Sequence, residues 1–383
     1  MADKSWHRRA CPRFDVLEER AMPSILTVTN FSDHGFGSLR RAVALAHDGD
    51  TIKFASWMPS GTITLTTGEI AINVGLTIQG PSASKLAISG NNASRIFNID
   101  SNASAVAITG VTLKNGLTNT FGGAILDFGT PLTLRWDTLS NNRAQSSSIN
   151  VSGGALAVFG QPTVGVAVTV ANCRFSNDAA IAGTALGGSA LGGAVYLDAE
   201  VSTDLVLSVT NSSFVGDFAT GSNSDQGGGA LGGGVYVSAG EAAEPQFRFS
   251  GDTFSSCTAA GGASAHGNVG GSGNGGAIYY SAFLAAAPTL SVAGCNFSSN
   301  SALGGDGGAG DAAAGGVGGI GGSGGSGFGG AVSAQFDSSA AAYDIFTGDT
   351  FAFNRAAAGN GGAGGAGSFG GKGGSGGAAV GLK

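Results

Sequence analysis

The feature that most constrains this chain is a two-part repeat in which one spacing is fixed and the other varies. A Gly-Gly-Ala/Gly-apolar phrase begins at Gly122, Gly153, Gly192, Gly232, Gly275 and Gly329, and a large apolar anchor residue follows at Leu139, Phe175, Phe214, Phe254, Phe297 and Phe351. The two are 17 residues apart in the first copy and 22 residues apart in the next five, whereas 8 to 26 residues separate each repeat from the next Gly-Gly. A rigid half-unit joined to one that tolerates insertions predicts a solenoid whose coils share one variable corner.

Inside the fixed half, apolar residues recur with a period of two, which is typical of strands. Five residues before each anchor stand Leu134, Val170, Val209, Phe249, Val292 and Phe346, and three residues before most anchors stands Asn or Gly, which suits a corner at positive φ. Each coil is therefore expected to contain two strands, an Asn/Gly corner and a third, short strand. In the repeat that begins at Gly192, these strands are expected at 192–197, 205–209 and 214–219. Stacked coils of this kind predict an all-β, parallel β-helix of about eight or nine coils.

The chain divides into three parts on this reading. Residues 1–24 form a polar leader with nine formal charges, residues 25–60 form an N-terminal strand and a capping helix, and residues 61–383 form the β-helix. The helix is expected to begin near Ser38, because Leu39, Ala42, Val43 and Ala46 make one apolar face that would cover the first coil. Glycine-rich insertions lie at 303–328 and 357–375, and the C-terminal cap is predicted to be missing.

Composition excludes several classes of function. With 71 glycines, 42% hydrophobic residues and 22 Phe, the chain can bury a core although it is unusually rich in glycine. The net charge of -7 and the scattered basic residues argue against nucleic-acid binding. No apolar run is long enough for a transmembrane helix.

One column of polar residues is the main candidate site. The position three residues after each anchor holds Asn142, Asp178, Asp217, Cys257, Asn300 and Asn354. Stacking would bring Asp178 and Asp217 to about 5 Å, close enough to share a calcium ion or to raise one pKa. However, half of the column is Asn, and an invariant Ala follows two residues later. We therefore interpret the column as a structural ladder, and we expect no catalytic or cofactor-binding residues, with calcium at Asp178 and Asp217 as the alternative.

Other residues of the types found in active and metal sites lack the neighbouring residues that such a site requires. The stretch 304–311, "GGDGGAGD", approaches a calcium-binding nonapeptide, but Asp311 falls one residue early and no tandem copy follows. His266 lies in a Gly/Ser loop without the Asp pair and Arg-x-Lys of a polysaccharide hydrolase. Cys173 and Cys295 occupy one repeat position three coils apart, about 14 Å, which is too far for a disulfide. We expect free thiols at these positions and at Cys257.

Three resemblances accompany this interpretation. Residues 13–24, "RFDVLEERAMPS", resemble an N-terminal segment of planctomycete surface proteins, which implies export. The GGA[I/L/V] and Fxx[N/D] phrases resemble the repeats of chlamydial polymorphic outer membrane proteins, and residues 26–54 with 76–97 look like the opening of bacterial right-handed parallel β-helix surface proteins with the pectin-lyase-like fold. The glycine-rich insertions are loosely similar to mycobacterial glycine-rich surface domains.

These resemblances imply a non-catalytic, exported, extracellular or cell-surface protein of structural or adhesin-like function, whose partner is an extracellular polysaccharide or protein. The alternative is a polysaccharide lyase or glycoside hydrolase of the same fold, a fold in which pectate lyases bind calcium through aspartates. The glycine-rich insertions leave two structures open: a flexible polymer, or extended glycine helices packed in register. The sequence leaves the oligomeric state open.

Overall fold

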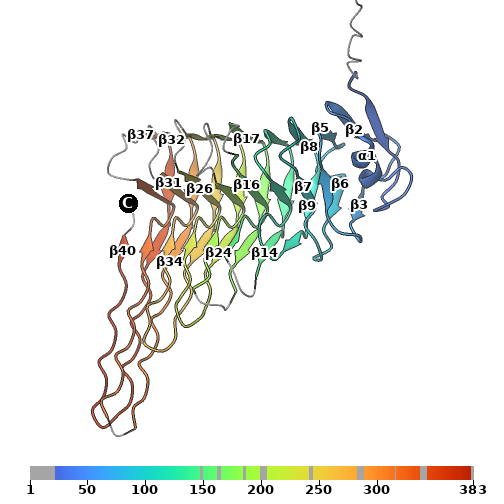
Figure 1. Cartoon of the computed structure of the whole chain (residues 1–383). Coiled ribbons are helices and arrows are strands. Elements are labelled where there is room, and N and C mark those ends of the chain that lie inside the picture. Colours follow the sequence, from blue (N-terminus) through green and yellow to red (C-terminus); the bar gives the residue numbers. More distant parts are fainter. Residues whose placement is uncertain are drawn as a thin grey trace, which may run out of the picture.

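The chain forms a rod of stacked coils with a thin projection along one edge (Figure 1). The computed structural model describes residues 22–146, 150–161, 165–183, 187–198, 205–240, 245–282, 289–314, 316–336 and 343–380. The predicted leader, 1–24, lies outside the described residues up to position 21. Among the described residues, all strands belong to five parallel sheets that run along the rod, so the protein is a parallel β-helix, as predicted.

Three sheets enclose the main core. Sheet A contains β1 (Ile25–Val28), β2 (Asp50–Phe54), β5 (Leu76–Gln79), β8 (Val106–Thr109), β12 (Leu132–Arg135), β17 (Val166–Ala171), β22 (Leu205–Thr210), β27 (Gln246–Ser250), β32 (Thr289–Ala293) and β37 (Tyr343–Thr347). Sheet B contains β3 (Gly61–Thr64), β6 (Leu86–Ser89), β9 (Thr112–Lys114), β13 (Thr138–Ser140), β18 (Arg174–Ser176), β23 (Ser213–Val215), β28 (Thr253–Ser255), β33 (Asn296–Ser298) and β38 (Thr350–Ala352). Sheet C contains β4 (Ile70–Ile72), β7 (Phe97–Ile99), β11 (Ile125–Asp127), β16 (Leu156–Phe159), β21 (Val195–Asp198), β26 (Val235–Ala239), β31 (Ile278–Ala282) and β36 (Val332–Phe336).

Two further sheets form a narrow extension of the later coils. Sheet D contains β10 (Leu117–Thr118), β14 (Arg143–Gln145), β19 (Ala179–Ile181), β24 (Phe218–Thr220), β29 (Thr258–Ala260), β34 (Ser301–Leu303) and β39 (Arg355–Ala357). Sheet E contains β15 (Val151–Ser152), β20 (Ala190–Leu191), β25 (Ala230–Leu231), β30 (Gly273–Asn274), β35 (Gly327–Phe328) and β40 (Ala379–Val380). From β12 onward the chain visits the sheets in the order A, B, D, E, C, and the variable segments lie between D and E; the coil of β8 lacks a strand of sheet E, and the coils before it lack strands of both D and E.

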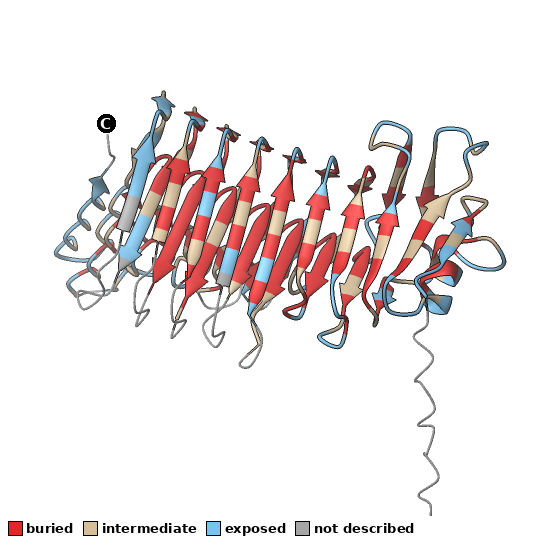
Figure 2. Ribbon diagram, turned by 90° about the horizontal axis from the view of Figure 1, so that it is seen from above, coloured by how far each residue is buried: buried red, intermediate tan, exposed pale blue. Residues whose placement is uncertain are grey.

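The anchors form a continuous stack in the core. The rings of Phe175, Phe214, Phe254, Phe297 and Phe351 lie parallel, with centroids 4.7, 4.7, 5.0 and 4.9 Å apart. The first four are fully buried, whereas Phe351 in the last described coil is 46% exposed. Figure 2 shows the same trend, with buried strands along the middle of the rod and exposed ones toward the C-terminal end.

Each coil has two corners before sheet D, where the sequence predicted one. The predicted corner exists, since Asn172, Asn211 and their equivalents have φ near +50° to +70°. A second corner follows the anchor, at residues such as Gly216 (φ 67°) and Ser256 (φ 56°). Therefore the single strand expected at 214–219 is wrong: it is split into β23 and β24, because a residue in the left-handed region interrupts the extended backbone.

The Gly-Gly phrase marks the point where the coil is narrowest. The first glycine, such as Gly192, has a φ of +64°, which disfavours other residues. The second, such as Gly193, lies so close to β24 that an added Cβ would be 2.5 Å from backbone atoms of Phe218. Beyond this point sheets D and E pack directly against each other through Ala144, Val151, Ala180, Ala182, Ala190, Ala219, Ala230 and Ala259. The invariant Ala of the repeat thus sets the small distance between the two layers.

The glycine-rich segments continue these two layers outward as a fin (residues 261–272, 304–314, 316–326 and 358–378), seen at the lower left of Figure 1. Its backbones are hydrogen-bonded at every third residue: Gly307 donates to the carbonyl of Asn360, and Gly310 to that of Ala363, both at 2.8 Å. The two layers are also joined, since Gly322 donates to Gly308 at 2.7 Å. Of the two structures left open by the sequence, the structure contains the packed, in-register one.

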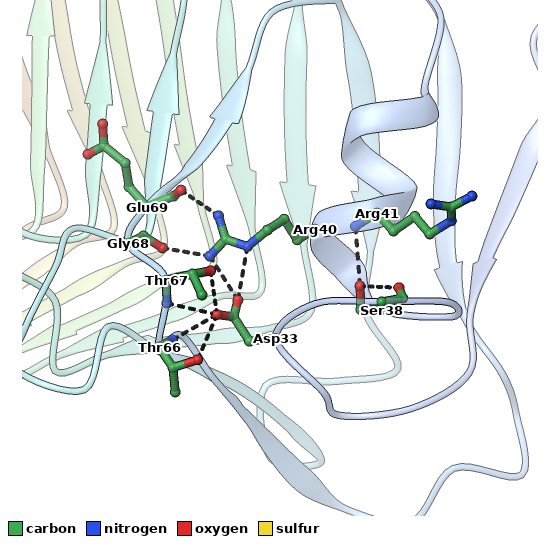
Figure 3. A network of polar contacts seen from close by, with 9 residues as sticks. Asp33, Ser38, Arg40, Arg41, Thr66, Thr67, Gly68 and Glu69 are labelled. Carbon is green, nitrogen blue, oxygen red and sulfur yellow. Dashed lines mark hydrogen bonds and ion pairs between the residues drawn. The ribbon is translucent and has the colours of Figure 1, made fainter.

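The N-terminal end is covered by α1 (Leu39–Leu45), as predicted. The Ser38 hydroxyl accepts a hydrogen bond from the N–H of Arg41 at 3.3 Å, and Leu39, Ala42 and Val43 are buried. A polar network holds the cap to the first coils (Figure 3). In it, Asp33 accepts bonds from Thr66, Thr67 and Arg40, and Arg40 also donates to the carbonyls of Gly68 and Glu69.

Candidate functional sites

The predicted Asn/Asp column lies at the corner between sheets B and D. Its side chains link successive coils, because an Oδ1 atom accepts a hydrogen bond from the backbone N–H of the equivalent residue in the preceding coil. These bonds run from Asn142 to Asp178 (2.8 Å), from Asp178 to Asp217 (2.9 Å), from Cys257 to Asn300 (2.9 Å) and from Asn300 to Asn354 (3.0 Å). The column is a ladder along the rod axis, in which Asn142 Nδ2 also donates to Asp178 Oδ1 and Asn300 Nδ2 to Asn354 Oδ1, both at 2.9 Å.

The amides and the acids of this column differ in the contacts of their second polar atom, Nδ2 in Asn and Oδ2 in Asp. The Nδ2 groups of Asn142, Asn300 and Asn354 donate to the carbonyl of the anchor one coil earlier, at 3.1, 3.0 and 2.9 Å. The Cys257 thiol makes the same kind of contact with the Phe214 carbonyl, at 3.6 Å. In contrast, the buried Oδ2 atoms of Asp178 and Asp217 have no hydrogen-bond partner among the described residues.

The environment of these two acids favours the neutral carboxyl group. Both side chains are fully buried. Burial raises the pKa of Asp178 to about 7. Burial also raises the pKa of Asp217 well above its usual range, and the charge of Asp178 raises it further. A protonated carboxyl group resembles the Asn amide of the neighbouring coils, because its O–H can donate where Nδ2 donates. A cation between the two acids would have to enter a site in which both side chains are fully buried.

A second ladder, which the sequence analysis missed, lies at the corner between sheets A and B. It contains the residues two positions before the anchors: Asp137, Cys173, Ser212, Asp252, Cys295 and Asp349. Ser212 accepts from the N–H of Cys173 at 3.1 Å, Asp252 from Ser212 at 2.7 Å, and Asp349 from Cys295 at 2.7 Å. The shared offset from the anchor was visible in the sequence, but the mixture of Asp, Ser and Cys concealed it.

The two ladders also account for the cysteines, since Cys257 belongs to the first and Cys173 and Cys295 belong to the second. Cys173, Cys257 and Cys295 are free and buried, as the spacing predicted. Burial raises the pKa of the Cys173 thiol to about 12, and the charge of Asp137 raises it further. Burial likewise raises the pKa of Cys295 to about 11. Since the thiolate is the reactive form, these thiols are poor nucleophiles and act as packing and hydrogen-bonding groups.

An open groove of about 1100 Å³ lies beside the first strands of sheet D. Its lining includes Glu69, Arg95, Thr118, Asn119 and Gln145. Arg95 forms an ion pair with Glu69 and donates to Thr118 Oγ1 at 3.1 Å, so the two charges compensate each other. The remaining amide and hydroxyl groups suit an uncharged polar ligand such as a sugar chain. The sequence analysis missed this groove because its residues are distant along the chain.

His266 lies at the fin in contact with two acids from neighbouring loops. Its Nδ1 is 2.9 Å from Asp311 Oδ1 and its Nε2 is 3.9 Å from Asp225 Oδ1. The hydrogen bond with Asp311 raises the pKa of His266, and the charges of Asp311 and Asp225 add to this shift. All three side chains are exposed, and no group of three or more His, Cys, Asp or Glu in the described part of the chain is arranged to hold a metal ion.

The fold and these sites define the class of the protein as a parallel β-helix with a packed glycine-rich fin. Comparisons with known protein families, with curated proteins and with solved structures find no match. No helix within the described residues is long and apolar enough to cross a membrane.

Proposed function

We propose that the protein is a non-catalytic, exported rod of the cell surface, with a structural or adhesin-like function. The observation that carries this proposal is the position of the polar columns: before the last described coil, their acids, amides and thiols are buried and linked to neighbouring coils by hydrogen bonds, and so are inaccessible to a substrate. Such columns stiffen a rod, and the fin extends its surface along one edge. The leader's resemblance to planctomycete surface proteins supports export.

Fractionation of the native cell tests the location. We expect the protein in the surface or extracellular fraction, with the leader either retained or cleaved as shown by mass spectrometry of its N-terminus. Recovery of the full-length chain in the cytosol would contradict the proposal. A periplasmic marker and a cytosolic marker in the same fractions control for lysis.

We propose that the groove at Glu69 and Arg95 holds the extracellular polysaccharide partner. The same groove is where the alternative function, a polysaccharide lyase or glycoside hydrolase, would place its chemistry, since Glu69 is a carboxylate with 35% of its side chain exposed. Incubation with acidic and neutral polysaccharides separates the two functions. Binding without new reducing ends or unsaturated products supports the structural function, whereas product formation that Glu69→Gln abolishes supports the enzyme.

Calcium binding by Asp178 and Asp217 is tested by a melting curve. We propose that both acids act only in the ladder, so addition of calcium is expected to leave the melting temperature unchanged. An increase in melting temperature that saturates with calcium, and that Asp178→Asn removes, would contradict this role.

A further inference from the structure

The groove beside β10 lies where the narrow extension of the coils begins. β10 is the first strand of sheet D and pairs with β14 on one side only. In the coil before it, the chain passes from β6 in sheet B to β7 in sheet C without strands in sheets D and E. Arg95 lies in this connection, shortly before β7. The groove is therefore a step between a short coil and a longer one.

Arg95 takes the place of a neighbouring strand at this step. Its Nε donates to the carbonyls of Phe121 (3.1 Å) and Gly122 (2.9 Å), and one terminal nitrogen donates to the Phe121 carbonyl (2.9 Å) and to Thr118 Oγ1 (3.1 Å). The other terminal nitrogen forms the ion pair with Glu69. Because all three nitrogens of the guanidinium group bond within the protein, and only 9% of the side chain is exposed, Arg95 is not available to bind a carboxylate group of a ligand.

Glu69 is the charged group that the groove presents to a ligand. Its side chain is 35% exposed, against 9% for Arg95, and its Oε1 accepts a hydrogen bond from Asn98 Nδ2 at 3.0 Å. Glu69 and Arg95 are the only charged residues among the described residues that line the groove, and Arg143 on β14 is not part of this lining. An acidic ligand would meet the exposed carboxylate, while the compensating charge is largely buried, and this arrangement is unfavourable.

The uncharged part of the lining suits the hydroxyl groups of a sugar. Asn119 and Gln145 carry exposed amide groups, and the buried Oγ of Ser94 has no hydrogen-bond partner among the described residues. A sugar hydroxyl can donate to such groups and also accept from them. Leu117 and Ile181 add apolar surface to the same lining, as is usual in ligand sites with a few polar groups.

We propose that Glu69 is the specificity-determining residue of the groove, so that the groove binds uncharged sugar chains and excludes chains that carry carboxylate groups. This inference rests on the proposed polysaccharide partner of the groove and defines its chemical class. Glu69 acts in two ways: its exposed carboxylate repels an acidic sugar, and its bond to Arg95 occupies the one guanidinium group of the lining. Glu69→Gln removes both effects and leaves the groove with a net positive charge.

The test uses oligosaccharides that share a backbone and differ only in charge. Fluorescently labelled oligosaccharides of uronic acids are compared with the same chains after reduction of their carboxyl groups to primary alcohols, by fluorescence anisotropy with the full-length protein. The parent chain is expected to bind the reduced form at least about fivefold more tightly, the size expected for one pair of exposed charges. Glu69→Gln is expected to remove this preference, and high salt should weaken the binding of the acidic form that the variant gains.

Matched variants separate a local effect from an effect of net charge. Asp225→Asn removes one negative charge from an exposed side chain of the fin, outside the groove, and should keep the preference of the parent chain. Circular dichroism melting verifies that Glu69→Gln is folded. If it is not folded, Gln145→Lys, which keeps the ion pair and adds a positive charge to the lining, is expected to lower the preference in its place.

The outcomes distinguish this inference from the proposed function. Equal binding of the two forms by the parent chain, or a preference for the acidic form, would overturn the selectivity and leave the polysaccharide partner in place. A preference that is unchanged in the folded Glu69→Gln variant would overturn the role of Glu69. Binding of neither form, across backbones of different linkage, would overturn both the selectivity and the polysaccharide partner.

Discussion

Replacing the two buried acids of the ladder by their neighbours' amide should stabilise the protein, and increasingly so as the pH rises. Asp178→Asn keeps the Oδ1 atom that accepts from Asn142 and replaces the unpartnered Oδ2 by a donor. Asn142 and Asn300 show where such a donor is used, since both bond to an anchor carbonyl. The substitution therefore removes a buried ionisable group without opening a cavity.

The magnitude follows from the raised pKa. Burial raises the pKa of Asp178 to about 7 in the folded chain, against about 4 for an unfolded Asp. Between about pH 4 and pH 7, Asp178 is protonated in the folded chain and ionised in the unfolded chain. The stabilisation that this proton gives to the folded chain is therefore fully present below about pH 4. It falls by about 1.4 kcal/mol per pH unit up to about pH 7. At pH 8 we expect Asp178→Asn to be more stable than the parent chain by about 4 kcal/mol, and at pH 4 by little.

The assay is urea denaturation followed by far-UV circular dichroism at intervals from pH 4 to pH 8. Comparison at each pH cancels the contributions of the other buried acids except Asp217, whose pKa the charge of Asp178 raises, so the difference reports the pair of acids. Asn300→Asp, in the same column, is the reciprocal variant: it should lose stability at pH 8 relative to pH 4. A stability difference between Asp178→Asn and the parent chain that does not change with pH, or a less stable variant at pH 8, would refute the neutral-acid ladder.

Three further variants test the packing and the cap. Gly193→Ala, whose Cβ would lie 2.5 Å from the Phe218 backbone, should lower the free energy of unfolding by about 3 kcal/mol or more. Gly370→Ala, whose Cβ would meet nothing within 4 Å, should leave the melting temperature unchanged, and equal melting temperatures for both variants would contradict the close packing at Gly193. Phe214→Ala, in the middle of the stack with 4.7 Å to each neighbouring ring, should lose about 3–5 kcal/mol in urea denaturation, and a loss below about 1 kcal/mol would argue against a continuous core. Asp33→Asn tests the cap: although burial raises the pKa of Asp33, bonds from Thr66, Thr67 and Arg40 outweigh it and hold the pKa well below its usual range. The stabilisation by ionised Asp33 is present above about pH 4 and is lost as the pH falls. Asp33→Asn should therefore be less stable than the parent chain at pH 7, and by a smaller amount at pH 2. A loss of stability that does not change with pH would exclude the ionised carboxylate as the cause.

The sequence was most informative where burial repeats with a local period. The anchors, the Asn/Gly corner before them and the capping helix at Ser38 each depend on the conformation of a few neighbouring residues, and each is found where it was expected. The second corner was missed although Asn141, Asn177 and Gly216 mark it in three coils, because the pattern is broken in the next three by Ser256, Ser299 and Phe353, with φ values of 56° to 57°. These residues do not signal a left-handed conformation, and the stacking of coils imposes it.

The sequence by itself determined the main features of the coil: which residues point inward, where the backbone makes its first corner, and which segment accepts insertions. Only the tertiary structure decided the rest. The state of Asp178 depends on the backbone N–H of Asn142 and on the carboxylate of Asp217, which lie in other coils, 36 and 39 residues away. A local pattern specifies the period of burial, but the partner of each buried or exposed polar group is chosen by the register between coils, and this register exists only after the coils have stacked.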